Sequence, residues 1–96
     1  MSTREQLHAF LEKAKHDARI KPSHVSLYIA LYSYWLLNDF SNPFYISREK
    51  IMAYAHIAST ATYHKVLRDL CAFEYVTYEP SYDPRIRSKV CLSKLD

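Results

Sequence analysis

The region from about residue 23 to residue 40 constrains the fold most, because it predicts a helix that is apolar on almost every face. Pro22 or Ser23 can open this helix, and the run from Asn38 to Pro43 predicts its end and a loop. A helix without a polar face is usually central to a core or covered by a partner. The chain has 96 residues, which fit one domain with a modest core. We therefore expect one side of this helix to face the core and the other to lie in a dimer interface. Its apolar residues are Val25, Leu27, Tyr28, Ile29, Leu31, Tyr32, Tyr34, Trp35, Leu36 and Leu37.

An amphipathic helix is predicted before the apolar one, running to about Arg19. Its apolar residues recur every three or four positions, as along one stripe of a helix, and Pro22 follows its end. We expect a single domain over residues 1–96, with residues 1–20 as an N-terminal helix and dimerisation arm and residues 22–92 as the core. The expected partner is a second copy of the chain, bound through residues 3–40. The stripe consists of Leu7, Phe10, Leu11, Ala14 and Ala18.

The rest of the chain predicts the order strand, short helix, tight turn, longer helix and β-hairpin. This is the order of a winged helix-turn-helix, so the predicted fold class is α+β and mostly α, with an extra N-terminal helix and a C-terminal hairpin as the wing. The expected elements are a strand at Phe44–Ile46, a helix from Ser47 to about Ala55, a helix from Ser59 to about Phe73, and strands at Tyr75–Glu79 and Lys89–Leu92.

The turn between the two helices has small and apolar residues where a helix-turn-helix needs them. Ile57 is expected to pack the helices together, and Ala53, Ala55 and Ala58 allow them to approach closely. Ser59 can accept hydrogen bonds from the free backbone donors at the start of the second helix. That helix start is also the end that enters a major groove in this class of protein.

The second helix of this pair has an outward face that suits DNA. If Tyr63, Val66, Leu67 and Leu70 pack inward, the 100° step of a helix leaves a set of short and basic residues outside. Base-edge contacts are expected from Thr60, Ala61 and His64, and phosphate contacts from Lys65 or Arg68. The alternative is that any helix on a protein surface has an exposed polar face, and the helix alone does not decide between the two. The outward set is Thr60, Ala61, His64, Lys65 and Arg68, and Ser59 at the helix start is also expected to lie in the DNA interface.

The hairpin favours the DNA interpretation. Arg85, Arg87 and Lys89 alternate, so in an extended segment all three point to one side while Ile86, Val90 and Leu92 point to the other. A basic outer side suits a DNA backbone, although edge strands also carry Lys and Arg to block aggregation. Ser47 and Arg48, at another predicted helix start, are expected to add a backbone contact.

Composition excludes several classes of function. The chain has no glycine, so it lacks the glycine-rich loops that hold phosphates in P-loop and dinucleotide-binding proteins. Cys71 and Cys91 have no metal or redox spacing and are expected to be small buried residues. No acid/base pair or catalytic triad is recognisable, and we expect no enzyme activity and no cofactor.

The net charge of +3 permits a nucleic-acid partner without requiring one. The histidines at positions 8, 16, 24, 56 and 64 lack the i, i+4 spacing of zinc ligands and are expected to be polar surface residues.

Nothing in the sequence predicts a signal peptide, and the most apolar run, Val25 to Leu37, is shorter than the roughly 20 apolar residues that span a bilayer. The expectation is a soluble cytoplasmic protein without a membrane partner.

From Lys21 onward the chain resembles a group of small bacterial winged-helix proteins, regarded as transcriptional regulators and often linked to conjugative transposons and plasmids. The most specific similar motif is Tyr78-Glu79-Pro80-Ser81-Tyr82. The resemblance implies a winged-helix fold and DNA binding, with no catalytic residues or cofactor. The chain departs from the group in the wing, where it reads Ile86-Arg87-Ser88 in place of a Lys-Gly-Ser turn. The other similar stretches are Lys21–Tyr28, Asn42–Arg48, Ala61–Leu70 and Tyr75–Pro84.

The predicted function is therefore sequence-specific binding of double-stranded DNA, by a transcriptional regulator or an accessory factor of a mobile element. The alternative is a winged-helix protein-interaction module that does not contact DNA, because a fold does not fix a function.

Overall fold

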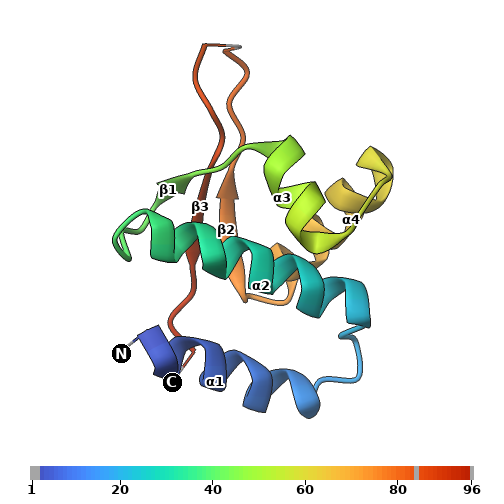
Figure 1. The fold of residues 1–96 in the computed structure, drawn as a ribbon. Helices are drawn as coiled ribbons and strands as arrows, with labels where there is room; N and C mark the ends of the chain where they lie inside the picture. The colour runs from blue at the N-terminus through green and yellow to red at the C-terminus, as the bar shows by residue number, and fades with distance from the viewer. Residues whose placement is uncertain (1–2, 84, 96) are drawn as a thin grey trace.

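The computed structural model describes residues 3–83 and 85–95. Within them the chain forms four helices and three strands, in an α+β fold that is mostly helical (Figure 1), as predicted. The elements are α1 (Thr3–Lys15), α2 (Pro22–Leu37), β1 (Phe44–Tyr45), α3 (Arg48–Ala55), α4 (Thr60–Ala72), β2 (Val76–Glu79) and β3 (Lys89–Leu92).

The three strands form an antiparallel sheet with β3 in the centre. Phe44 of β1 pairs with Val90, and Val90 pairs on its other edge with Tyr78 of β2. Ile46 extends the β1 edge, because its N–H donates to the carbonyl of Ser88 at 3.0 Å. Strand β3 is thus held on both sides, and the loop of the β2–β3 hairpin projects beyond the helices, at the end of the molecule opposite α1 (Figure 1). We call residues 80–83 and 85–88 the hairpin loop.

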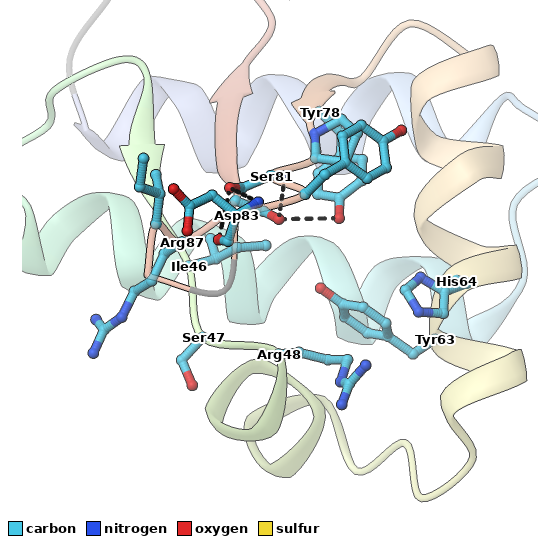
Figure 2. A pocket seen from close by; sticks show the side chains of 13 residues that line it. Ile46, Ser47, Arg48, Tyr63, His64, Tyr78, Ser81, Asp83 and Arg87 are labelled. Carbon is cyan, nitrogen blue, oxygen red and sulfur yellow. Dashed lines mark hydrogen bonds between the residues drawn. The ribbon is translucent and has the colours of Figure 1, made fainter.

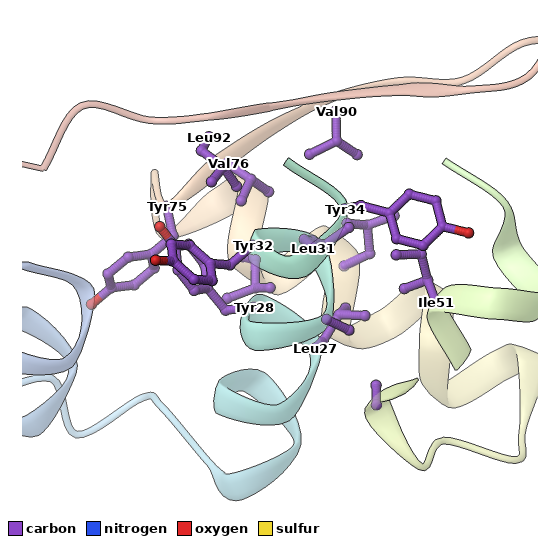
Figure 3. Packing of buried hydrophobic residues seen from close by; sticks show 14 of the residues in the cluster. Leu27, Tyr28, Leu31, Tyr32, Tyr34, Ile51, Tyr75, Val76, Val90 and Leu92 are labelled. Carbon is purple, nitrogen blue, oxygen red and sulfur yellow. The ribbon is translucent and has the colours of Figure 1, made fainter. Parts of the chain in front are cut away.

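Helix α2 is the centre of the core, as its apolar composition predicts. It contacts α1, α3, α4 and β3, and Leu27, Tyr28 and Leu31 are fully buried among residues from the helices and the sheet (Figure 3). Its outer side exposes Ile29 and Leu37. The helix ends at Leu37 and not near residue 40, because the chain turns into left-handed conformations at Asp39 and Phe40, with φ of 55° and 62°.

Helix α1 packs on the core through one aromatic residue and one buried polar residue. Phe10 is fully buried and stacks on Tyr28, with ring centroids 3.7 Å apart. The amide of Gln6 is also buried and donates to the hydroxyl of Tyr28 at 2.8 Å and to the carbonyl of Ser93 at 3.1 Å. The stripe prediction was wrong at Leu11, which is 42% exposed, and at its C-terminal end, because α1 stops at Lys15 and leaves Ala18 exposed.

The chain that follows α1 is fixed by an ion pair. Asp17 accepts hydrogen bonds from the guanidinium of Arg19 at 2.8 Å and from the hydroxyl of Tyr75 at 2.8 Å. The guanidinium carbon of Arg19 lies 4.2 Å from the ring centroid of Phe73. These contacts join the end of α1 to the segment between α4 and β2. The Arg19 hydrogen bond, followed by that of Tyr75, holds the pKa of Asp17 well below its usual range, against the opposing effect of desolvation.

The lowered pKa of Asp17 predicts a loss of stability in acid. A carboxyl with a depressed pKa in the folded state stabilises the fold above its unfolded pKa. This contribution begins to fall below about pH 4 and is lost as the pH falls through the lowered pKa of the folded state. We expect Asp17→Asn to lower the free energy of unfolding at pH 7, and the difference from wild type to shrink at pH 3. Urea unfolding at both values measures this. Glu12→Gln, which removes an exposed pair with Lys15, is the control and should change little at either pH. A deficit in Asp17→Asn that is equal at pH 7 and pH 3 would contradict the assignment.

The α3–α4 turn forms without glycine. His56 takes the left-handed conformation at the C-terminus of α3, with φ of 56°, a region in which histidine is more common than most residues. Ile57 is buried, as predicted, and the hydroxyl of Ser59 accepts a hydrogen bond from the N–H of Thr62 at 3.2 Å. Ser26 of α2 adds a hydrogen bond to the carbonyl of Ala55.

The predicted role of small residues in the helix packing was wrong for two of the three alanines. Ala55 is buried, but Ala53 and Ala58 are exposed, so only one of the three alanines lies in the helix packing. Ser47 occupies the N-cap position of α3, but its side chain makes no capping hydrogen bond. It lies instead at the edge of the hollow described next.

Candidate nucleic-acid interface

A hollow of about 610 Å³ lies between the start of α3, the first half of α4 and the hairpin loop (Figure 2). Four of the predicted site residues, from segments far apart in the sequence, line it: Ser47, Arg48, His64 and Arg87. The remaining lining residues are Ile46, Tyr63, Tyr78, Pro80, Ser81, Tyr82, Asp83, Ile86 and Ser88.

The faces of α4 are arranged as the spacing predicted. Tyr63, Val66, Leu67 and Leu70 are all buried. The predicted outward residues are exposed except His64, which is half-buried with its ring edge against Tyr63 at a centroid distance of 5.1 Å. Ser59, Thr60, Ala61, Lys65 and Arg68 therefore form the open face of α4, and His64 lies at its border with the hollow.

One predicted cation of α4 is partly neutralised. The Nζ of Lys65 lies 3.0 Å from Asp69, one helical turn further along. Asp69 also bonds His24, and this hydrogen bond, more than that of Lys65, holds the pKa of Asp69 below its usual value. Arg68 is exposed and forms no ion pair with any other described residue.

The prediction that every histidine is a surface residue was wrong for His24, which is 4% exposed. Its Nδ1 accepts a hydrogen bond from the N–H of Lys21 at 2.8 Å, so its Nε2 carries the proton that is donated to Asp69 at 2.8 Å. His24 thereby ties the start of α2 to the middle of α4. The burial follows from the pairing of residues 45 positions apart, which helical spacing does not reveal.

The three cations of the hairpin have different surroundings and do not form one basic side. Arg85 pairs with Asp83 at 3.1 Å, and its hydrogen bonds hold the pKa of Asp83 below its usual value. Lys89 is half-buried in β3, with its Nζ 5.5 Å from the ring centroid of Tyr45. Arg87 is exposed and lines the hollow.

The expected alternation also fails at Ile86, which was predicted on the inner side and is 52% exposed. Its segment, residues 85–88, forms no strand, and β3 begins only at Lys89. Val90 and Leu92, inside β3, are buried as predicted.

Hydrogen bonds within the hairpin loop shape the rim of the hollow. The hydroxyl of Ser88 accepts from the N–H of Ser81 at 3.1 Å and from the hydroxyl of Tyr78 at 3.3 Å. The hydroxyl of Ser81 donates to the carbonyl of Asp83 at 3.2 Å. These bonds connect the two sides of the loop. Figure 2 shows Arg87 on the side of the hollow where Ser47 lies, with its guanidinium directed away from Tyr63 and His64 of α4.

Tyr63 is a residue of the hollow that the sequence did not indicate. Its helical spacing assigns it to the core, and its side chain is 1% exposed, yet it lines the hollow and directs its hydroxyl into it (Figure 2). Burial raises the pKa of Tyr63 to about 12, so the hydroxyl keeps its proton at neutral pH. The only available signal was a tyrosine at an inward position where phenylalanine or leucine would fill the same space.

The described residues contain no group of three or more His, Cys, Asp or Glu side chains placed to hold a metal ion. Cys71 and Cys91 are free thiols and half-buried, less enclosed than expected. None of the helices in the described part of the chain combines the length and apolar character needed to cross a membrane.

Comparisons with known protein families, with characterised proteins and with solved structures find no match to this chain. The resemblance to winged-helix regulators thus stays a prediction, supported by the residues that suggested it.

Proposed function

We propose that this chain is a winged-helix protein that binds double-stranded DNA in a sequence-specific way, as a transcriptional regulator or mobile-element accessory factor. The observation that carries the proposal is the meeting of Arg48, His64 and Arg87 around one hollow beside the open face of α4. A helix face with an adjoining basic loop is what a duplex contact requires, because phosphate contacts position a protein and base contacts specify the sequence. In this proposal α4 enters the major groove and the hairpin loop is the wing.

The roles of the residues follow from their exposure. Thr60 and Ala61, at the exposed start of α4, are placed for base-edge contacts, and His64 is within reach of the same groove from the border of the hollow. Arg68, Arg48 and Arg87 are exposed cations for phosphate. Lys65 and Arg85 contribute less charge than expected, because each pairs with an aspartate.

Selection of bound fragments from random duplex DNA tests the proposal. We expect one sequence motif to be enriched, and the affinity for it to fall steeply between about 50 and 200 mM salt, because protein cations replace condensed counterions. Failure to enrich any motif would contradict sequence-specific binding. Affinity that is indifferent to salt would exclude the phosphate contacts.

We also propose that two copies of the chain associate through the outer side of α2. Ile29, Leu37 and Tyr54 are 41%, 71% and 56% exposed, and they border a hollow of about 480 Å³. This α2 patch, lined by Ile29, Ala30, Ser33, Leu36, Leu37 and Tyr54, has both a protruding leucine and a shallow apolar recess, as a two-fold interface needs. A second copy also provides a second DNA half-site, which one module with roughly 600–1,000 Å² of DNA interface lacks.

Leu37→Asp should convert a dimer into a monomer, because the interface would have to bury an unpaired carboxylate. Sedimentation velocity at several protein concentrations measures this. Ile86→Asp, which changes an exposed apolar residue of the hairpin loop, is the matched control and should leave the dimer intact. Wild-type protein that remains monomeric at every concentration contradicts the dimer.

The α2 patch also favours the second candidate function, a winged-helix interaction module without DNA contact. An exposed apolar patch on a small protein commonly marks a protein-binding surface. Monomeric wild-type protein combined with failure of the DNA selection would favour this function over the first.

A further inference from the structure

The hydroxyl of Tyr63 has no hydrogen-bond partner among the residues that the structure describes, although its side chain is 1% exposed. Within those residues, the indole nitrogen of Trp35 is the only fully enclosed side-chain N or O atom that lacks a partner. The hydroxyl of Tyr63 therefore opens onto the hollow, and Figure 2 shows it directed there. A hydroxyl that reaches an open hollow from a buried ring is placed to bond whatever occupies it.

The surroundings of this hydroxyl favour an anion. Arg48 is close enough for its charge to act on the hydroxyl and oppose the increase in the pKa of Tyr63. Figure 2 shows Arg48 and His64 near the ring of Tyr63. A protonated hydroxyl and a guanidinium are both donors, and together they complement the oxygens of a phosphate.

The start of α3 adds to this preference. Ser47 is its N-cap residue but makes no capping hydrogen bond, and its side chain lines the hollow with Arg48. The first N–H groups of a helix and its dipole favour an anion at this end. The one acidic side chain of the lining, Asp83, is paired with Arg85, so it opposes an anion only weakly.

We propose that the hollow binds a phosphate group between the hydroxyl of Tyr63, the guanidinium of Arg48 and the start of α3. In DNA binding this is a backbone phosphate next to the groove that α4 enters, and that form of the inference rests on the proposed function. The same site accepts free phosphate in the absence of DNA.

Tyr63→Phe tests the site, because it removes one hydroxyl and keeps the buried ring. The full chain, labelled for NMR, is titrated with inorganic phosphate at constant ionic strength, with chloride as the reference anion. The affinity for the selected duplex is measured in parallel by fluorescence anisotropy. Tyr45→Phe, on an exposed tyrosine of β1 that does not line the hollow, is the matched control, and urea unfolding checks that each variant remains folded.

We expect phosphate to shift the signals of Tyr63, His64 and Arg48 in wild type and in Tyr45→Phe, and to shift them much less in Tyr63→Phe. The duplex affinity of Tyr63→Phe should fall about tenfold, equally on all sequences, because one hydrogen bond to a charged group is lost and no base contact changes. A loss of duplex affinity in Tyr63→Phe identifies a backbone phosphate as the ligand. If Tyr63→Phe loses the signal shifts caused by inorganic phosphate, and wild type binds no duplex, the result supports the phosphate site and contradicts the proposed function. Tyr63→Phe that matches wild type in both measurements overturns the inference.

Discussion

Arg48→Ala combined with Arg87→Ala should weaken binding to the selected duplex about 60-fold at about 0.1 M salt. Each phosphate contact contributes about 0.9 to the slope of log affinity against log salt, so two lost contacts flatten the slope by about 1.8. Over the tenfold range from 1 M to 0.1 M salt, this difference in slope separates the affinities of wild type and the double variant by about 1.8 decades. Both side chains are exposed and lie on the hollow beside α4, so the folded structure should tolerate both changes. Anisotropy titrations across a salt series give the affinity and the slope together.

The control for the arginine pair keeps the same change in net charge. Arg4→Ala with Lys13→Ala removes two exposed cations from α1, at the end of the molecule opposite the hairpin loop (Figure 1). This variant should keep the wild-type slope within experimental error. If both double variants lose the same affinity, net charge and not the hollow determines binding, and the assignment of Arg48 and Arg87 is wrong.

Phe10→Ala should lower the free energy of unfolding by about 3–5 kcal/mol, the usual cost of removing a buried phenylalanine. The ring is fully buried, stacks on Tyr28 and meets Tyr75 edge-on at a centroid distance of 5.2 Å. A loss of this size is a large part of the 5–15 kcal/mol typical of a small domain. Urea unfolding followed by circular dichroism measures the change.

Leu11→Ala is the matched control for Phe10→Ala, since Leu11 is the next residue of α1 and is 42% exposed. It should cost no more than about 1 kcal/mol, because less apolar surface is removed from water. Equal losses in the two variants would show that α1 does not pack on the core. The comparison of these two variants also bears on the proposed dimer, because an α1 that packs on the core leaves the α2 patch exposed.

The elements after Phe44 could be predicted because their signals are local. Ser59 caps α4, and the inward positions Tyr63, Val66, Leu67 and Leu70 follow the helical repeat. Lys89–Leu92 was predicted as a strand and is β3 with the same bounds. The ends of α1 and α2 were less predictable, because an ion pair at Asp17 and left-handed residues at Asp39 and Phe40 follow these helices.

The candidate site was predictable in its location and less so in its composition. The spacing of α4 identified its open face, and Arg48 and Arg87 do line the hollow. The hairpin was the weaker part, because alternation places side chains only where the chain is extended, and residues 85–88 form no strand. The pairing of Arg85 with Asp83 lies within the loop itself, where two aspartate oxygens are in reach of one guanidinium.

The sequence by itself determined the order of the elements, the inward face of α4 and the apolar character of α2, since these depend on residues a few positions apart. Only the tertiary structure decided which side of α2 stays exposed, and that Gln6, His24 and Tyr63 have roles beyond those their spacing suggests. Gln6 bonds Tyr28, 22 positions away, and Ser93, 87 positions away. His24 bonds Asp69, 45 positions away. Tyr63 faces a hollow whose other walls come from α3 and the hairpin loop. The environment of a side chain depends on which distant segments pack around it, and local periodicity carries no information about that choice.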